Sequence, residues 1–133
     1  MARTAFEKLH VYRLSEKLAD DVWDAVADGA PFAKDTVGKQ LVRAADSIGA
    51  NIAEGSGRGS YKDNRRFVRV ARGSLNETQH FLRRAFRRKL LTVDEIERLR
   101  RTIDELAPRL NAFLKSIGPV AKPKATRRRT TDN

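Results

Sequence analysis

The sequence predicts an all-α fold, an up-down-up-down four-helix bundle. Apolar residues recur at spacings of three and four over four long segments, which is the spacing that lines one face of a helix. Segments that contain glycine, proline or serine separate these stretches, and no segment alternates apolar and polar residues as a half-buried strand does. Because short connections place successive helices side by side and antiparallel, four such helices favour a bundle.

Length and composition bound the domain organisation. The chain has 133 residues, of which 40% are hydrophobic and 34% are charged, enough for one domain with its own core. We expect the bundle to span residues 1–118, and the Pro-, Lys- and Arg-rich residues 119–133 to form a disordered basic tail. The chain has no cysteine, no signal-peptide-like start and no apolar run of the ~20 residues that cross a bilayer. These features favour a cytoplasmic protein with no membrane partner.

The first two helices follow from their apolar stripes and their breaks. The first helix is predicted from about Leu9 to Asp28 and ends in residues 29–31, because Gly favours a helix cap and Pro cannot continue a helix. The second is predicted to begin near Asp35, a favoured N-cap residue, and to stop in the glycine-rich residues 55–59.

The last two helices carry clear start signals. The third is predicted from Ser60, which forms a capping-box pattern with Asp63, to about Leu90. The fourth begins at Thr92, whose pattern with Glu95 is a standard capping box. Its apolar residues alternate spacings of three and four throughout, which is typical of knobs-into-holes packing against another helix.

A polar stripe runs along the second helix beside its apolar face. It consists of Arg43, Ser47, Asn51 and Glu54, at spacings of four, four and three. A short hydroxyl and an amide between a cation and a carboxylate suit a hydrogen-bonded network at a helix–helix contact, because buried polar groups must find partners. An ordinary solvated helix face explains the same stripe equally well.

The third helix offers partners for that stripe. Glu77 is an isolated carboxylate among arginines. We therefore predict a structural polar network across the contact between the second and third helices, made of Arg43, Ser47, Asn51, Glu54, Arg72, Ser74 and Glu77. If buried, such a network sets the register of the helices more than it adds net stability.

Two glycines lie inside the predicted helices. Gly49 and Gly73 each cost up to ~1 kcal/mol relative to Ala. We expect close helix approach to offset that cost, although tolerance within a stable bundle is the alternative.

Positive charge is concentrated in the second half of the chain. Residues 1–60 hold 8 Lys and Arg against 9 Asp and Glu, and residues 61–133 hold 20 against 8, so the net charges of −1 and +12 sum to +11. Such a balance points to an anionic partner, with RNA or DNA first. Because arginine favours bidentate phosphate contacts, we predict a nucleic-acid-binding surface on and beside the third helix, made of Arg58, Lys62, Arg65, Arg66, Arg69, Arg83, Arg84, Arg87 and Arg88.

The same cations have a competing use. The first helix carries Glu16, Asp20, Asp21, Asp24 and Asp28. An acidic first helix and a basic third helix can pair within one bundle, or head to tail between copies, and head-to-tail contacts close into a ring when the rotation allows it. Net charge therefore leaves open an oligomeric protein-interaction scaffold that does not bind nucleic acid directly and whose partner is another protein.

Several local motifs together resemble one bacterial family. They are Gln40-Leu41, Arg43-Ala44-Ala45, Ser47-Ile48, Asn51 to Gly55, Arg66-Phe67, Ala71 to Ser74 and Glu77. The chain is similar, from about Phe6 to Ile117, to the four-helix-bundle proteins encoded in intervening sequences of large-subunit ribosomal RNA genes, also called S23-type ribosomal proteins. The accessory variability determinants of diversity-generating retroelements resemble them in turn. The resemblance implies a cytosolic bundle that assembles into a ring, commonly a homopentamer, binds nucleic acid in some members and has no enzymatic activity.

Motifs for catalysis, metal binding and cofactors are weak in this chain. His10 and His80 lack the spacing to carboxylates that a metal site needs, and Ser47 and Ser74 lack a His–Asp pattern for nucleophilic catalysis. Gly55, Gly57 and Gly59 fit a linker between helices better than a phosphate-binding loop, because no strand precedes them and the loop lysine is absent. We therefore expect no enzyme activity, no metal and no cofactor.

Overall fold

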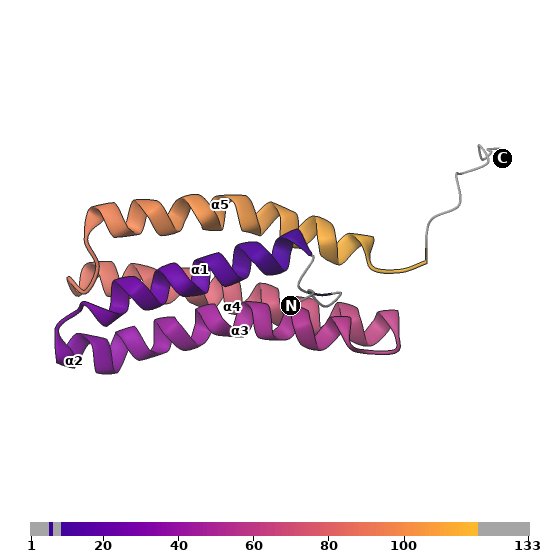
Figure 1. Cartoon of the computed structure of the whole chain (residues 1–133), viewed down its shortest axis with the longest axis horizontal. Coiled ribbons are helices and arrows are strands. Elements are labelled where there is room, and N and C mark those ends of the chain that lie inside the picture. The colour runs from indigo at the N-terminus through magenta and orange to yellow at the C-terminus, as the bar shows by residue number, and fades with distance from the viewer. Residues whose placement is uncertain (1–5, 7–8, 120–133) are drawn as a thin grey trace, which may run out of the picture.

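The computed structural model is an antiparallel bundle of helices and describes residue 6 and residues 9–119. Four long helical stretches run up and down in turn, and the described residues include no strand (Figure 1). Helix α1 (His10–Ala27) packs on α3 (Lys39–Ser56) and on α5 (Val93–Ser116), while α4 (Tyr61–Arg87) packs on the same two helices. The α1–α3 and α4–α5 contacts therefore lie on opposite sides of the bundle. The four-helix bundle predicted from the sequence is confirmed.

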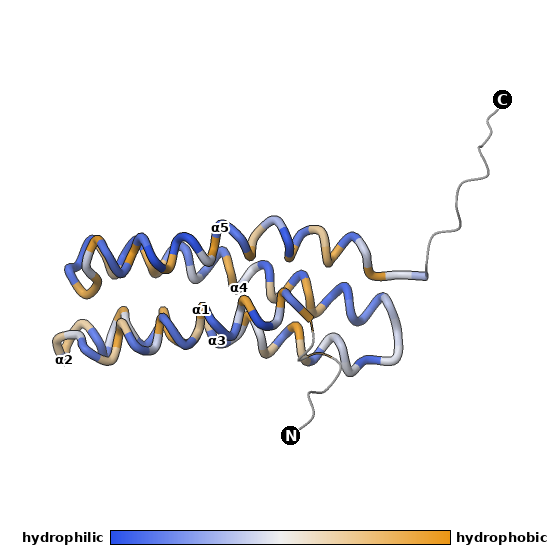
Figure 2. The backbone as a smooth tube through the Cα atoms, turned by 45° about the horizontal axis from the view of Figure 1, so that its top comes forward, coloured by the Kyte–Doolittle hydropathy of each residue, from blue (hydrophilic) through white to orange (hydrophobic). Residues whose placement is uncertain are grey.

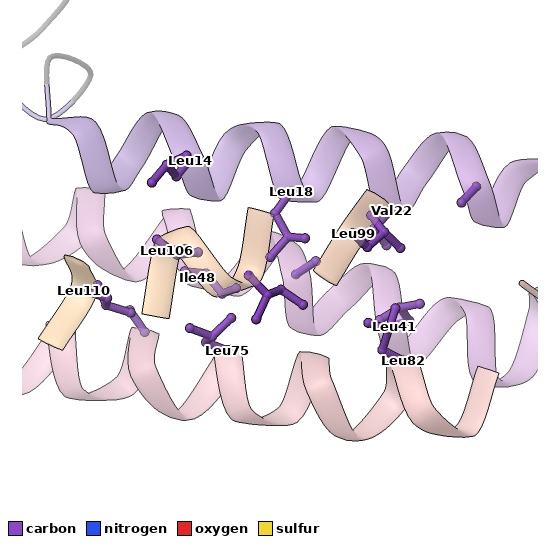
Figure 3. Packing of buried hydrophobic residues seen from close by; sticks show 14 of the residues in the cluster. Leu14, Leu18, Val22, Leu41, Ile48, Leu75, Leu82, Leu99, Leu106 and Leu110 are labelled. Carbon is purple, nitrogen blue, oxygen red and sulfur yellow. The ribbon is translucent and has the colours of Figure 1, made fainter. Parts of the chain in front are cut away.

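The core is built by the apolar stripes of all four long helices. Hydrophobic residues recur along each helix between hydrophilic ones (Figure 2), and the stripes meet on the bundle axis. Leu18 of α1, Ile48 of α3, Leu75 of α4 and Leu106 of α5 point toward one another, and none is more than 2% exposed (Figure 3). Burying a side chain of this size contributes about 1.5–3 kcal/mol, so these central residues hold the helix faces in register.

The second helical stretch begins earlier than the sequence predicts. A short helix α2 (Pro31–Ala33) passes through a π-helical turn, η2 (Lys34–Gly38), into α3 without a break. Proline at the first helical position is favourable because its fixed φ suits that turn and its missing N–H has no partner there anyway. The prediction that Asp35 caps this helix is therefore wrong, since Asp35 lies within the helical stretch.

The turns at the two ends of α4 follow the predicted chemistry closely. The Ser60 hydroxyl accepts a hydrogen bond from the Asp63 N–H at 3.1 Å, and the Thr92–Glu95 capping box at the start of α5 is complete. Helix α4 ends at Arg87, three residues before the predicted end, because Lys89 adopts a left-handed φ of 64°. The turn buries Leu90 and Leu91, which close this end of the core.

Candidate nucleic-acid interface

One end of the bundle gathers cations from the α3–α4 turn and the start of α4. Ser60 caps α4, and the first turns of the helix then carry Lys62, Arg65, Arg66 and Arg69 while the turn before it carries Arg58. Arg58, Lys62, Arg66 and Arg69 are exposed and Arg65 is half-buried. We call these five residues, Arg58, Lys62, Arg65, Arg66 and Arg69, the basic end.

Phe67 and two carboxylates hold part of the basic end in place. The guanidinium carbons of Arg58 and Arg66 lie 4.7 Å and 4.5 Å from the centre of the Phe67 ring, a cation–π distance. Arg58 also donates to Glu54 at 2.6 Å, and Arg66 lies 3.8 Å from Asp63. Lys62 and Arg69 make no hydrogen bond or ion pair within the described residues. Their charges therefore remain available to an external anion.

The chain leaves the bundle beside the basic end. Arg65 donates through Nη1 to the Ile117 carbonyl at 3.0 Å and so ties the last residues after α5 to the start of α4. The described chain ends at Pro119, two residues beyond this contact. Figure 1 shows the end of α5 at the same end of the bundle as the α3–α4 turn. The predicted basic tail, residues 119–133, lies outside the described residues except for Pro119, but its sequence begins at this point.

The remaining predicted cations form a second, separate group. Arg83, Arg84, Arg87 and Arg88 lie at the far end of α4, and residues 73–82 between the two groups contain no Lys or Arg. Fifteen residues separate Arg69 from Arg84, which at ~1.5 Å per residue is roughly 22 Å along the helix. The structure therefore divides the predicted binding surface into two clusters.

The second cluster borders a groove between α4 and α5. The groove has a cavity volume of about 670 Å3. Its apolar floor includes Phe86 and Ile96, and Arg83, Arg87 and Arg100 stand around it. No hydrogen bond or ion pair joins these three arginines to any described residue. We call this site the α4–α5 groove.

Three residues of the predicted polar network do meet at the α3–α4 contact. Ser47 Oγ and Ser74 Oγ lie 2.9 Å apart, and Asn51 donates through Nδ2 to Ser47 Oγ at 3.0 Å and to the Ser47 carbonyl at 2.8 Å. Ser74 is 8% exposed, and Ser47 and Asn51 are half-buried. Because these polar groups partner one another, they cross between the helices without a buried unpaired hydroxyl.

The four charged members of that prediction lie elsewhere. Arg43, Glu54, Arg72 and Glu77 are all exposed. Glu54 binds Arg58 on its own side of the bundle, and Arg72 donates to Asn111 Oδ1 of α5 at 3.4 Å. Arg43 and Glu77 make no hydrogen bond or ion pair within the described residues. The prediction of one seven-residue network is wrong in this respect, because long charged side chains reach solvent more cheaply than they enter a helix contact.

The opposite side of the bundle holds an acidic cavity that the sequence did not reveal. A small cavity of about 150 Å3 lies between α1 and α3, and Glu16, Asp20 and Asp46 line it with no cation among its lining residues. Burial, and then the charge of Asp20, raise the pKa of Asp46 above its ordinary value of 3.8. The spacing within α3 could not show this, because Asp20 and Asp46 come together only when α1 packs on α3.

The described residues contain no group of three or more side chains of the types that ligate metals. None of the helices in this part of the chain is long and apolar enough to cross a membrane. His10 instead lies across the α1–α5 contact, with Nε2 3.2 Å from Glu105 Oε2.

Comparisons with known proteins agree with the fold and the motifs. A crystal structure of a protein of unknown function from the S23 ribosomal protein family of Bacteroides thetaiotaomicron VPI-5482 matches with a TM-score of 0.69. The two sequences are 24% identical, and the match covers 80% of this chain and 99% of that one. A comparison with curated proteins gave no match. The family model of the 23S rRNA-intervening sequence protein matches residues 7–112, and the chain therefore belongs to this family.

Proposed function

We propose that the chain is a non-enzymatic, basic, oligomeric bundle protein of the cytoplasm that binds RNA or DNA mainly through phosphate contacts at the basic end. The observation that carries this proposal is the convergence of unpaired cations with the exit of the chain. Lys62 and Arg69 are exposed without partners among the described residues, and Arg65 holds Ile117 beside them. The 14 residues that follow Pro119 include Lys122, Lys124, Arg127, Arg128 and Arg129 against a single acid, Asp132.

Phosphate contacts explain the composition of the basic end better than base recognition does. Arginine and lysine neutralise phosphates and release the counterions that surround them, which drives binding without regard to sequence. Tyr61, which is 54% exposed at the start of α4, is the aromatic residue placed to stack on an unpaired base there. One such residue supports a preference for single strands over sequence recognition.

Oligomer formation strengthens the same function. When several copies present their basic ends to one nucleic acid, each binding event after the first is intramolecular, and the overall affinity rises without any new kind of contact. A charge of +11 on each chain makes such a surface strongly dependent on salt.

The absence of a catalytic role is part of the proposal. The hydroxyls of Ser47 and Ser74 hydrogen-bond with each other and with Asn51 rather than with a histidine. A serine nucleophile needs a neighbouring base to remove its proton.

The test is a salt titration of oligonucleotide binding. We expect a short fluorescent single-stranded RNA to bind the full chain with an affinity that falls steeply as salt rises. The double variant Lys62→Gln/Arg69→Gln should reduce the slope of log K against log[salt] by about 1.4–1.8, at roughly 0.7–0.9 for each lost phosphate contact.

A matched variant controls for the loss of charge alone. Arg98→Gln/Arg101→Gln removes the same charge from an exposed part of α5 and should change the slope far less. Equal effects from the two double variants would show that net charge, and not the basic end, binds the nucleic acid. No salt-dependent retention of RNA or duplex DNA would reject nucleic-acid binding and leave the protein-interaction scaffold.

A further inference from the structure

We propose that the α4–α5 groove of one copy receives the α1–α3 face of a second copy, with Trp23 as the anchor. The α1–α3 face is the surface around the acidic cavity, formed by Glu16, Ala19, Asp20, Trp23, Asp46 and Ala50. This inference rests on the oligomeric part of the proposed function and does not depend on nucleic-acid binding.

The two surfaces are complementary in charge. The α1–α3 cavity is lined by three carboxylates and no cation, whereas four arginines and two carboxylates line the α4–α5 groove. Arg83, Arg87 and Arg100 have no partner within the described residues, and neither Asp20 nor Asp46 is paired there with a cation. Each surface therefore carries unpaired charge of the sign that the other lacks, which favours the encounter and sets its orientation.

The two surfaces are also complementary in shape. Trp23 is 62% exposed and follows Ala19 and Asp20 by four and three residues, so it stands on the same strip of α1. The residues around it on the face are small, which leaves the indole as a projection. The α4–α5 groove is a hollow of about 670 Å3 with an apolar floor that includes Phe86, itself 47% exposed. An exposed tryptophan that fills an apolar pocket ringed by arginines is the usual composition of an interface hot spot.

The two surfaces lie on opposite sides of the bundle but near the same end of it. The α1–α3 and α4–α5 contacts are diagonal neighbours in the four-helix arrangement. A Cβ placed on Gly38 would lie 2.7 Å from Val26 Cγ1 and 3.2 Å from Leu90 Cδ2, so the end of α1 meets the α4–α5 turn. Trp23 precedes Val26 by about one turn, and Phe86 precedes Leu90 by about one turn. In Figure 3, Val22, Leu82 and Leu99 likewise lie at one level along the bundle.

Opposite sides at equal height are what a head-to-tail assembly of parallel bundles requires. Each copy can then offer its α1–α3 face to one neighbour and its groove to the other, and the contact closes into a ring if the rotation between copies allows it. All copies point the same way in this arrangement. Their basic ends therefore lie on one side of the assembly, clear of the contact.

The test uses two variants that each damage one surface. Trp23→Ser removes the anchor, and Arg87→Glu reverses a charge in the groove. Both positions are exposed, so circular dichroism should show an unchanged bundle. Light scattering of the full chain should give a multiple of its mass of 15.0 kDa for the parent and a single chain for each variant. We expect each change to raise the dissociation constant of the contact by about 30-fold or more.

A mixture of the two variants then identifies the contact as head to tail. The Arg87→Glu chain keeps its α1–α3 face and the Trp23→Ser chain keeps its groove, so one intact contact forms and the mixture should shift to twice the chain mass. Phe32→Ser, at an 83% exposed aromatic outside both surfaces, should keep the parent mass. A parent that is monomeric, single variants that keep the parent mass, or a mixture that stays monomeric would each overturn the inference.

Nucleic-acid binding is scored separately in the same proteins. Trp23→Ser should keep the affinity of the single chain for an RNA too short to bridge two basic ends. If Arg87→Glu instead loses that RNA while its mass stays at the parent value, the groove is a nucleic-acid site and the second-copy contact is rejected. A monomer that binds RNA would reject this inference alone, and an assembly that ignores RNA would reject the nucleic-acid proposal alone.

Discussion

Gly49 and Gly73 show how residues of the same type differ once the helices pack. A Cβ on Gly49 would lie 2.9 Å from Ser15 Oγ and 3.4 Å from Tyr12 Cε1, so α1 approaches α3 closely there. The close approach that the sequence predicts is confirmed at Gly49. A Cβ on Gly73 would meet nothing within 4 Å, so the prediction is wrong at Gly73 within this chain. Helical periodicity cannot separate the two cases, because it does not say what a neighbouring helix brings to the contact.

Alanine at these two glycines should therefore shift stability in opposite directions. Gly73→Ala should raise the free energy of unfolding by about 0.8–1 kcal/mol, because alanine is the better helix former and the site is open. Gly49→Ala should lower it by about 1 kcal/mol, since Ser15 Oγ is held at 2.7 Å from the Tyr12 carbonyl and yields only with strain. Urea unfolding of both variants measures this, and a stabilised Gly49→Ala would contradict the packing described for α1 and α3.

At the scale of the element, the caps and core stripes were predictable and the side-chain partnerships were not. Ser60 and Thr92 cap α4 and α5 as their local patterns predict. Ser47 and Ser74 are 27 residues apart and meet only through packing. The charged residues of the same stripes were predicted to join them and instead reach solvent. A helix can be recognised from residues within one turn, whereas a contact between helices depends on how each is rotated about its axis.

The raised pKa of Asp46 predicts a pH-dependent effect of Asp46→Asn. An acid whose pKa is higher in the folded state destabilises the fold when it is ionised, and that penalty disappears as pH falls toward its ordinary value of 3.8. Asp46→Asn should therefore melt higher than its parent at pH 7, by about 1–3 °C for a largely exposed surface group. The difference should shrink at lower pH.

The Asp46→Asn comparison is best made in the Trp23→Ser background, where a second copy cannot supply a cation. Asp24→Asn is the control, because Asp24 is an exposed carboxylate on α1 that does not line the cavity. If the melting difference for Asp46→Asn grew as pH fell, burial and the charge of Asp20 could not be the cause of the raised pKa.

At the scale of the whole molecule, charge is divided by position. The basic end and the exit of the chain lie together, while the α4–α5 groove and the α1–α3 face lie toward the other end on opposite sides. This division lets assembly and nucleic-acid binding use different cations of the same helix. The sequence predicts that helix as one continuous basic surface, and its two functions as competitors for that surface.

Removal of residues 120–133 should separate binding from folding. The truncation takes away 5 cations and 1 acid, so the net charge falls from +11 to +7. The salt slope of RNA binding should become shallower, since fewer phosphates are neutralised. The melting temperature should change by less than about 2 °C, because the described core runs from Val11 to Leu114. Calorimetry and the RNA titration measure the two effects, and a large loss of stability with unchanged RNA binding would assign the segment to the fold.

The sequence by itself determined the four helices, their caps, their buried faces and the large positive charge. All of these depend on residues within about one helical turn of each other or on simple counts, and local periodicity and capping chemistry record them directly. Only the tertiary structure decided which charges are neighbours: it divided the arginines of α4 into two clusters, placed Asp46 beside Asp20 and put the acidic cavity opposite the groove. The physical reason is that the rotation and pairing of helices are set by packing the whole core, to which residues far apart in the chain contribute together.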